Sequence, residues 1–370
     1  MSRPEVVVVG AGIVGACVAL RLAQGGAQVT VVDAGPPASG ASRASFAWAN
    51  SFSKTPRPYY DLNVAGIAEH AALARELGGG WFHRVGNLKW EAAPERQRAL
   101  RETTARLREW GYPVEALSGR EARRLEPELA IDDAVDLVAH TPEDGWVEAV
   151  PLVGAALARA RDAGARVLPG HRVTALRQAD GRVRGVLTEP GGELGADVVV
   201  DCAGAGAGEL ARLAGVELAV TGEPGRLIYT APVALALRHV VHGPGVHFRA
   251  DGSGRVILSD ESRDLVVALD AGRGDPERSV AAVARYLPAL AGVAVEAVRI
   301  GARPMPADRL PAVGPVPGAD GLYVVVSHSG VTLGALWGRI AAAEILGGLA
   351  DPRLADFRPG RLVRAPARVV

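Results

Sequence analysis

The first 33 residues alternate between apolar runs and glycine turns in the order typical of a strand–helix–strand unit. Residues 5–9 contain four consecutive valines, residues 28–32 form a second short apolar run, and residues 13–25 between them are apolar and rich in small side chains. Short runs without polar alternation are typical of strands buried on both faces, and the longer run is typical of a buried helix. The pattern predicts a parallel βαβ unit.

Beyond this unit the hydrophobic period changes several times. Residues 223–298 contain short β-runs joined by Gly, Pro and Asp, with one helix at 277–286, which is typical of an antiparallel sheet. Residues 321–346 return to a strand, a turn and an apolar helix, so we expect the nucleotide-binding part to be assembled from separated segments. The other predicted helices are 57–77, 94–110, 119–125 and 148–163, and the other predicted strands are 85–90, 166–168, 173–178, 183–188 and 197–200.

Composition narrows the class of protein. Of the 370 residues 48% are hydrophobic and 22% are charged, which favours a stable globular body. The formal net charge is zero and no block of like charges occurs, so we expect no nucleic-acid partner. Cys17 and Cys202 lack metal-ligand spacing, so we predict free thiols and no metal site. Glycines and Arg21 interrupt the apolar run at 6–22, so we expect no transmembrane segment and a cytoplasmic protein.

A glycine motif joins the first predicted strand to the helix. Gly10, Gly12 and Gly15 allow a tight turn, close approach of a pyrophosphate and close helix packing, and the helix N-terminus stabilises phosphate charge. Asp33 ends the second strand, where its carboxylate can accept hydrogen bonds from a ribose hydroxyl and would repel the 2′-phosphate of NADP. The predicted dinucleotide contacts are Gly10, Gly12, Ile13, Val14, Gly15, Asp33 and Ala34.

The loop after Asp33 favours FAD over NAD. An NAD-binding domain would continue with another regular βα unit, whereas residues 38–45 are rich in Ser, Ala and Gly. This loop offers hydroxyls, backbone N–H groups and one cation to the phosphates and ring of a longer cofactor; the alternative is a surface loop without a ligand. The expected FAD contacts here are Ser42, Arg43, Ala44 and Ser45.

Several motifs, in the same order along nearly the whole chain, resemble those of the FAD-dependent D-amino-acid oxidase, glycine oxidase and sarcosine oxidase family. They are the glycine motif with Asp33, Ser42-Arg43-Ala44-Ser45, Asp144-Gly145-Trp146, Cys202-Ala203-Gly204, Gly301-Ala302-Arg303-Pro304 with Asp308 and Pro311, and Ser327-His328-Ser329-Gly330. The resemblance implies an α/β fold, α+β overall. A discontinuous Rossmann-like FAD-binding domain would span 1–80, 145–222 and 300–370, and an antiparallel-sheet substrate-binding domain 81–144 and 223–299.

The resemblance also assigns roles to single residues. It implies that the backbone of Val173 holds the adenine, and that Ala203 and Gly204 lie at the cofactor. Neither cysteine stands where some members tether the flavin, and the loop at 42–48 holds no His, so we expect noncovalent FAD. Arg303 matches the arginine that binds the substrate carboxylate in the family. A guanidinium suits this role because it can donate two parallel hydrogen bonds. In a chain so rich in Arg, a surface role is the alternative.

The C-terminal turn joins a predicted strand to a helix, so its backbone N–H groups can stabilise negative charge on a flavin. His328 within it is either a catalytic base or a positional residue. Tyr229, His247 and Arg249 lie on the predicted antiparallel sheet, where they either line the pocket or serve as ordinary sheet residues. The expected catalytic residues are Arg303, Tyr229 and His328; further cofactor contacts are Arg303, Ser329, Gly330, Val331 and Thr332.

The expected activity is FAD-dependent oxidation of the C–N bond of a small amino acid or of a secondary or cyclic amine. A hydride passes to the flavin, and the electrons pass on to O₂ or another acceptor. One alternative is an NAD-dependent dehydrogenase that uses only the N-terminal motif. Another is a flavoprotein that relays electrons without an amine substrate of its own.

Overall fold

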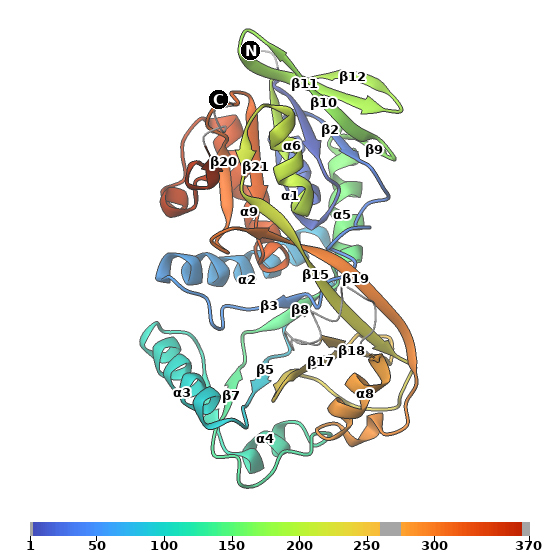
Figure 1. The fold of residues 1–370 in the computed structure, drawn as a ribbon, viewed down its shortest axis with the longest axis vertical. Helices are drawn as coiled ribbons and strands as arrows, with labels where there is room; N and C mark the ends of the chain where they lie inside the picture. The colour runs from blue at the N-terminus through green and yellow to red at the C-terminus, as the bar shows by residue number, and fades with distance from the viewer. Residues whose placement is uncertain (1–2, 260–274, 365–370) are drawn as a thin grey trace, which may run out of the picture.

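The computed structural model describes residues 3–259 and 275–364, and its elements form two parts that lie one above the other in Figure 1. A six-stranded sheet forms the upper part and an eight-stranded sheet the lower part, with α2 (Arg57–Leu77) between them. Parallel and antiparallel sheets occur together, so the predicted mixed α/β class is confirmed. The domain ranges given above include residues 1–2, 260–274 and 365–370, which lie outside the described residues.

The six-stranded sheet is parallel except at one edge. Its order is β20-β21-β13-β1-β2-β9, and β20 is antiparallel to β21. Val6 and Val8 pack into one hydrophobic cluster and Val7 and Val9 into another, so the central strand is buried on both faces as its valine run predicts. The strands are β1 (Glu5–Val9), β2 (Gln28–Asp33), β9 (Arg166–Pro169), β13 (Val198–Asp201), β20 (Ala312–Pro315) and β21 (Leu322–Val326).

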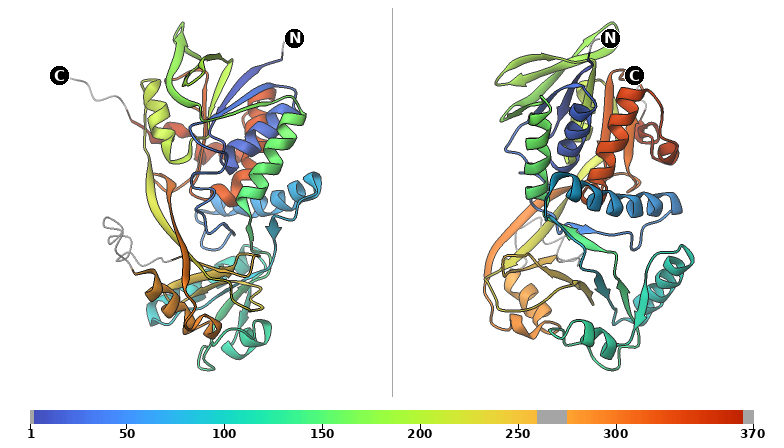
Figure 2. Two further views of the ribbon diagram at one scale, coloured as in Figure 1. Left: turned by 90° about the vertical axis from the view of Figure 1, so that its right-hand side faces the viewer. Right: turned by 180° about the vertical axis from the view of Figure 1, so that it is seen from behind.

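Helices cover both faces of this sheet (Figure 2). On one face lie α1 (Ile13–Gln24), α5 (Ala149–Asp162) and α9 (Gly330–Gly347), and on the other lies α6 (Ala207–Leu213). A Cβ at Gly338 would lie 2.5 Å from the Cys17 carbonyl oxygen, so the backbones of α1 and α9 touch through this glycine. The close crossing brings the N-termini of both helices to the same side of the sheet.

The eight-stranded sheet forms the lower part. Its order is β19-β15-β18-β17-β16-β5-β7-β6, and all neighbours are antiparallel except β16 and β5. Phe248, Leu258 and Leu88 belong to its buried core. Its shorter strands are β5 (Asn87–Lys89), β6 (Glu115–Leu117), β7 (Val138–Thr141), β16 (Val240–Gly243), β17 (Val246–Ala250) and β18 (Val256–Ser259), and its helices are α3 (Pro94–Glu109), α4 (Gly119–Leu125) and α8 (Pro276–Ala284).

A long two-stranded ribbon connects the two parts. β15 (Val220–Thr230) pairs with β19 (Val295–Pro306) along their whole length, from Val220 opposite Pro306 to Thr230 opposite Val295. The sequence predicted an antiparallel sheet over 223–298 and placed residues 300–370 in the FAD-binding domain; residues 301–304 instead lie inside this ribbon. The ribbon therefore carries residues of the predicted substrate site across the boundary between the parts.

Smaller elements complete the described chain. One antiparallel sheet contains β10 (Arg172–Ala179), β11 (Arg182–Glu189) and β12 (Gly192–Gly195), and another contains β3 (Trp48–Ala49), β4 (Phe82–His83) and β8 (Gly145–Val147). β14 (Glu217–Leu218) pairs with β22 (Val363–Arg364), and 3₁₀ turns cover Gly204–Gly206, Pro288–Leu290, Pro352–Phe357 and Pro359–Leu362. The predicted strand at 85–90 corresponds to β5, which is shorter than predicted and spans Asn87–Lys89.

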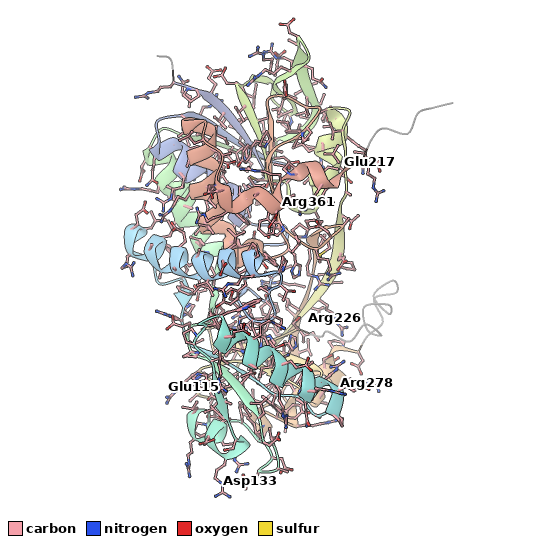
Figure 3. All side chains as sticks on the ribbon, turned by 90° about the vertical axis from the view of Figure 1, so that its left-hand side faces the viewer. Glu115, Asp133, Glu217, Arg226, Arg278 and Arg361 are labelled. Carbon is pink, nitrogen blue, oxygen red and sulfur yellow. The ribbon has the colours of Figure 1, made fainter. Side chains whose placement is uncertain are left out.

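Charged side chains of both signs occur on both parts of the molecule. Figure 3 places Glu217 and Arg361 beside the six-stranded sheet and Glu115 and Asp133 at the opposite end. Within the described residues, no single helix has the length and hydropathy needed to cross a membrane.

Candidate functional site

A cavity of about 1450 Å³ lies where the two parts of the molecule meet. Its upper wall comes from the N-termini of α1 and α9, the ends of β2 and β13, and the start of β10. Its lower wall comes from the ribbon and from β16 and β17. The cavity therefore opens at the carboxyl ends of the parallel strands, where ligands of doubly wound sheets bind.

Two glycines of the N-terminal motif are required by packing. Gly10 has a φ of +108°, and a Cβ there would lie 2.4 Å from the Cys202 carbonyl oxygen. A Cβ on Gly15 would lie 1.9 Å from the carbonyl oxygen of Gly10, so this residue acts from behind the cavity and does not line it. Gly12 lines the cavity, and its Cβ would meet only Ser42 Oγ, at 3.1 Å. The turn thus leaves room for a ligand above Gly12.

Asp33 and Ser42 fix the turn from the other side. Asp33 Oδ2 accepts from the Ala11 N–H at 2.7 Å, and Oδ1 accepts from the Gly35 N–H at 2.8 Å. Ser42 Oγ accepts from the Ile13 N–H at 2.9 Å, which ties the loop to the start of α1. Both carboxylate oxygens of Asp33 keep a second acceptor direction, and the residue lines the cavity, where a ribose could donate to it.

Replacing Asp33 with alanine should weaken FAD binding by about 10- to 100-fold, the equivalent of one hydrogen bond to a charged group. The change also leaves the N–H groups of Ala11 and Gly35 without their acceptors. Titration of the apoprotein with FAD, followed by flavin fluorescence, measures the effect. Asp33→Asn is the matched variant; it retains one acceptor oxygen and should bind FAD more tightly than Asp33→Ala. Wild-type affinity in Asp33→Ala would remove this residue from the site.

The loop after β2 divides into a side that faces the cavity and a side that faces solvent. Ser42, Ala44 and Ser45 line the cavity, whereas Arg43 is exposed and is not among the lining residues. Ser42 turns inward to Ile13, and the Arg43 side chain is exposed, so in this structure it does not face the cavity. Of the other predicted contacts, Ile13, Val14, Ala34, Val173, Ala203 and Gly204 all line the cavity.

Asp201 holds the turn at Ala203 through a hydrogen bond to its backbone. It is fully buried, its Oδ1 accepts from the Ala203 N–H at 3.0 Å, and its Oδ2 has no hydrogen-bond partner among the described residues. Burial raises the pKa of its carboxyl from the ordinary 3.8 to about 7. Between pH 3.8 and about 7 the Asp201 carboxyl keeps its proton in the folded protein but loses it in the unfolded chain. The contribution of the protonated carboxyl to the free energy of unfolding is therefore complete below pH 3.8 and is lost as the pH rises to about 7.

Asp201→Asn should consequently raise the free energy of unfolding, by about 4 kcal/mol at most near pH 8 and by less near pH 5. The amide keeps an acceptor for the Ala203 N–H and removes the charge. Urea unfolding of the FAD-saturated protein at the two pH values checks this expectation. A gain that does not change with pH would contradict the titration of this carboxyl.

The C-terminal turn presents backbone donors to the cavity. Ser329 to Thr332 line it, and no side chain caps the N-terminus of α9. Two residues of α2 hold the turn from behind: Tyr59 Oη lies 2.6 Å from Ser329 Oγ, and His70 Nε2 lies 2.7 Å from the Val331 carbonyl oxygen. Sequence reasoning missed both supports, because nothing local indicates which face of α2 meets this turn.

His328 lines the same cavity with its imidazole in the neutral form at neutral pH. Desolvation, followed by Lys54, Arg303 and Arg309, lowers its pKa to about 4. A base with so low a pKa is poorly matched to proton abstraction near pH 7. The lowered pKa therefore favours a positional role for His328 over the catalytic one.

Arg303 reaches the cavity from β19. Its Nη2 donates to the Pro224 carbonyl oxygen at 3.2 Å, and Glu223 Oε2 lies 3.8 Å away. Its Nε is buried without a partner among the described residues, which leaves a donor for a ligand. Tyr229 and Arg249 do not line the cavity: the Tyr229 hydroxyl faces Arg299 at 3.4 Å.

Aromatic side chains form the lower wall, and of these sequence reasoning had named only His247. The Trp48 and His242 rings lie 3.9 Å apart, and the His242 and His247 rings 4.1 Å apart. Phe46 lines the cavity beside them, and Arg249 donates from Nε to its carbonyl oxygen at 2.8 Å. Desolvation lowers the pKa of His247 to about 3, so this wall is uncharged at neutral pH. Alternation along β17 indicated His247, but nothing indicated that Trp48 would join it.

The donor set fits FAD. Two helix N-termini face one cavity, and neither is capped by the side chain of its own N-cap residue, Gly12 or Ser329; the glycine turn leaves room for a ligand near a carboxylate acceptor. No group of three or more potential metal ligands occurs among the described residues.

Comparison with known proteins gives a consistent result. The sequence matches the family described as FAD dependent oxidoreductase (DAO) over residues 5–344. Glycine oxidase of Geobacillus kaustophilus (strain HTA426) is 29% identical over 351 residues, which cover 92% of each chain. The crystal structure of glycine oxidase from Geobacillus kaustophilus superposes with a TM-score of 0.85 at 26% identity, over 98% of this chain and 99% of that one. Iminodiacetate oxidase from Chelativorans sp. BNC1 superposes with a TM-score of 0.81 at 27% identity, over 96% and 99%.

Proposed function

Because the chain belongs to the DAO family of FAD-dependent oxidoreductases, we propose that it oxidises the C–N bond of a small amino acid or of a secondary or cyclic amine. FAD is its cofactor, which rules out the NAD-dependent alternative. Bound FAD supplies the two-electron chemistry by accepting a hydride from the carbon next to nitrogen. The protein's own residues bind and orient the substrate and the cofactor, and they exclude water from the site.

In this proposal the cofactor is bound noncovalently along the upper wall. Asp33 would accept from the ribose, the N-terminus of α1 would hold the phosphates, and the backbone at Ser329 to Thr332 would stabilise negative charge on the ring. Denaturation in acid should release all flavin into the supernatant. Colour that stays with the precipitate would contradict noncovalent binding.

The substrate carboxylate pairs with Arg303, and this pairing carries the proposal. The unpartnered Nε and the neighbouring Nη2 offer two donors in one plane, which matches a carboxylate. The ring wall of Trp48, His242 and His247 then excludes water from the reacting carbon. Glycine and iminodiacetate, in the names of two relatives, each combine an amine with a carboxylate.

Mixing the FAD-loaded protein with candidate amines in the absence of oxygen tests the proposal. Glycine, sarcosine, D-amino acids and cyclic imino acids are the first panel, and loss of the flavin absorbance at about 450 nm is the readout. Bleaching by a carboxylate-bearing amine supports the proposal, and no bleaching by any of them favours a flavoprotein that only relays electrons. Admission of air afterwards separates an oxidase from a dehydrogenase.

A further inference from the structure

A second, smaller cavity of about 400 Å³ lies against the large one, on the side of the eight-stranded sheet. It is bounded by α3, by the turn between β16 and β17, and by the segment that follows β3. Phe52, Ala99 and Leu100 supply its apolar surface, and Lys89, Glu91 and Arg96 supply its charges. None of these residues belongs to the cofactor site described above.

The two cavities adjoin each other. His247 lines both. Phe52 and Ser53 line the small cavity, while Asn50 and Lys54 on either side of them line the large one. Gly243 lines the small cavity and the residue before it lines the large one. A ligand that lies over the flavin position is therefore next to the small cavity.

The charges of the small cavity favour an anion. Lys89 Nζ lies 3.2 Å from Glu91 Oε1, and both side chains are mostly buried, so this pair is close to neutral as a unit. Arg96 forms no hydrogen bond or ion pair within the described part of the chain and adds one uncompensated positive charge. Glu91 Oε2 is buried without a hydrogen-bond partner among the described residues, but Lys89, Glu91 and Arg96 together leave a net positive charge at the cavity. A guanidinium with free donors can bind a carboxylate through two hydrogen bonds.

We propose that the small cavity binds a second carboxylate of the substrate, at the end of an arm attached to the amine nitrogen. The inference rests on the proposed function and narrows its substrate class to secondary amines with a carboxylate on each side of the nitrogen. Arg303 pairs with the carboxylate next to the oxidised carbon, and Arg96 and Lys89 pair with the distal one. Phe52 and Leu100 contact the methylene groups of the arm.

A matched set of N-substituted glycines tests the arm. The substituents are 3-carboxypropyl, 3-carbamoylpropyl, 4-aminobutyl and propyl chains, and the carboxypropyl compound should have a kcat/KM about tenfold higher than the others. The advantage should appear in KM and in the dissociation constant from anaerobic spectral titration of the FAD-loaded protein. Preference for the ammonium or the neutral arm would overturn the inference.

Two variants on α3 locate the effect. Arg96→Gln should remove the roughly tenfold advantage of the carboxylate arm and leave the propyl compound unchanged. Arg98→Gln, on the same exposed helix but outside the cavity, is the control and should retain the advantage. Ala99→Trp should fill the cavity and exclude all three long polar arms while sarcosine is still oxidised. Equal losses of activity toward every substrate in Ala99→Trp would instead indicate that the small cavity is only a route by which substrates reach the large cavity.

The outcomes separate this inference from the proposed function. If no amine bleaches the flavin or perturbs its spectrum, both fail. If sarcosine or N-propylglycine bleaches the flavin and the carboxylate arm gives no higher kcat/KM, only the inference fails.

Discussion

Arg303→Lys is expected to lower kcat/KM for carboxylate-bearing amines by about 10- to 100-fold, with little change in the melting temperature. A lysine ammonium cannot reproduce two donors in one plane, and its charge is more strongly hydrated. In the structure one Nη2 hydrogen is donated to the Pro224 carbonyl oxygen, which leaves the second Nη2 hydrogen and the unpartnered Nε for a carboxylate, and lysine loses this planar pair. Steady-state rates and anaerobic flavin reduction measure the effect.

Arg299→Lys provides the matched control. Arg299 stands four residues earlier on β19, but its guanidinium lies over the Tyr229 ring, 4.6 Å from the centroid, and does not line the cavity. This variant should keep kcat/KM near the wild-type value. An Arg303→Lys enzyme with unchanged kcat/KM would show that the carboxylate is bound elsewhere.

Gly330→Val is expected to reduce FAD affinity by about 10- to 100-fold while the chain still folds. A Cβ at Gly330 would meet only Val14 Cγ2, at 3.6 Å, so the protein itself has room for a side chain. The added carbons instead occupy cavity space in front of the uncapped start of α9. The reduction potential of the remaining bound flavin should fall, because its ring is displaced from the backbone donors.

Two comparisons isolate the cofactor effect. Gly154→Val makes the same exchange on the exposed side of α5, where a Cβ meets nothing within 4 Å, and reports the general cost of valine in a helix. Gly330→Ala should lie between wild type and Gly330→Val. FAD titration, potentiometry and circular dichroism of each protein are the measurements, and full affinity in Gly330→Val would contradict a ring packed against this turn.

Local signals predicted the bounds of several elements in both parts of the fold. The predicted strand 5–9 and helices 57–77 and 119–125 match the observed bounds. In α4 the start is marked by Ser118 and Glu121, which form a reciprocal capping box. Strand, turn and cap signals depend on residues within a few positions, so they can be recognised without knowledge of the partner segments.

The ribbon was harder to predict because its pairing is distant in sequence. Gly301 and Pro304 are typical of turns, yet each lies inside β19 opposite Gly225 and Gly222. A Cβ at Gly301 would lie 2.6 Å from the Ala44 Cβ, so the glycine permits close contact with the cofactor loop and does not break the strand. The identity of a close neighbour on another segment cannot be inferred from spacing alone.

The sequence around each candidate residue also could not predict whether its side chain faces the cavity. Tyr229 and Leu227 share one face by alternation, yet Leu227 lines the cavity and Tyr229 does not, since the ribbon twists away from it. Arg43 is exposed, whereas its neighbour Ser42 turns inward and accepts from the Ile13 N–H. Motifs thus located the segments of the site, and packing selected the side chains.

On the ribosome, the N-terminal glycine motif emerges first and its neighbours emerge last. β1 cannot pair with β13 until residues 198–201 have been synthesised, and β21 and α9 can join the sheet only after residues 322–347 have been synthesised. Pairings so distant in sequence close late in folding. We therefore expect a nascent chain halted before residue 322 to retain no flavin, even though it already contains Gly10, Gly12 and Asp33.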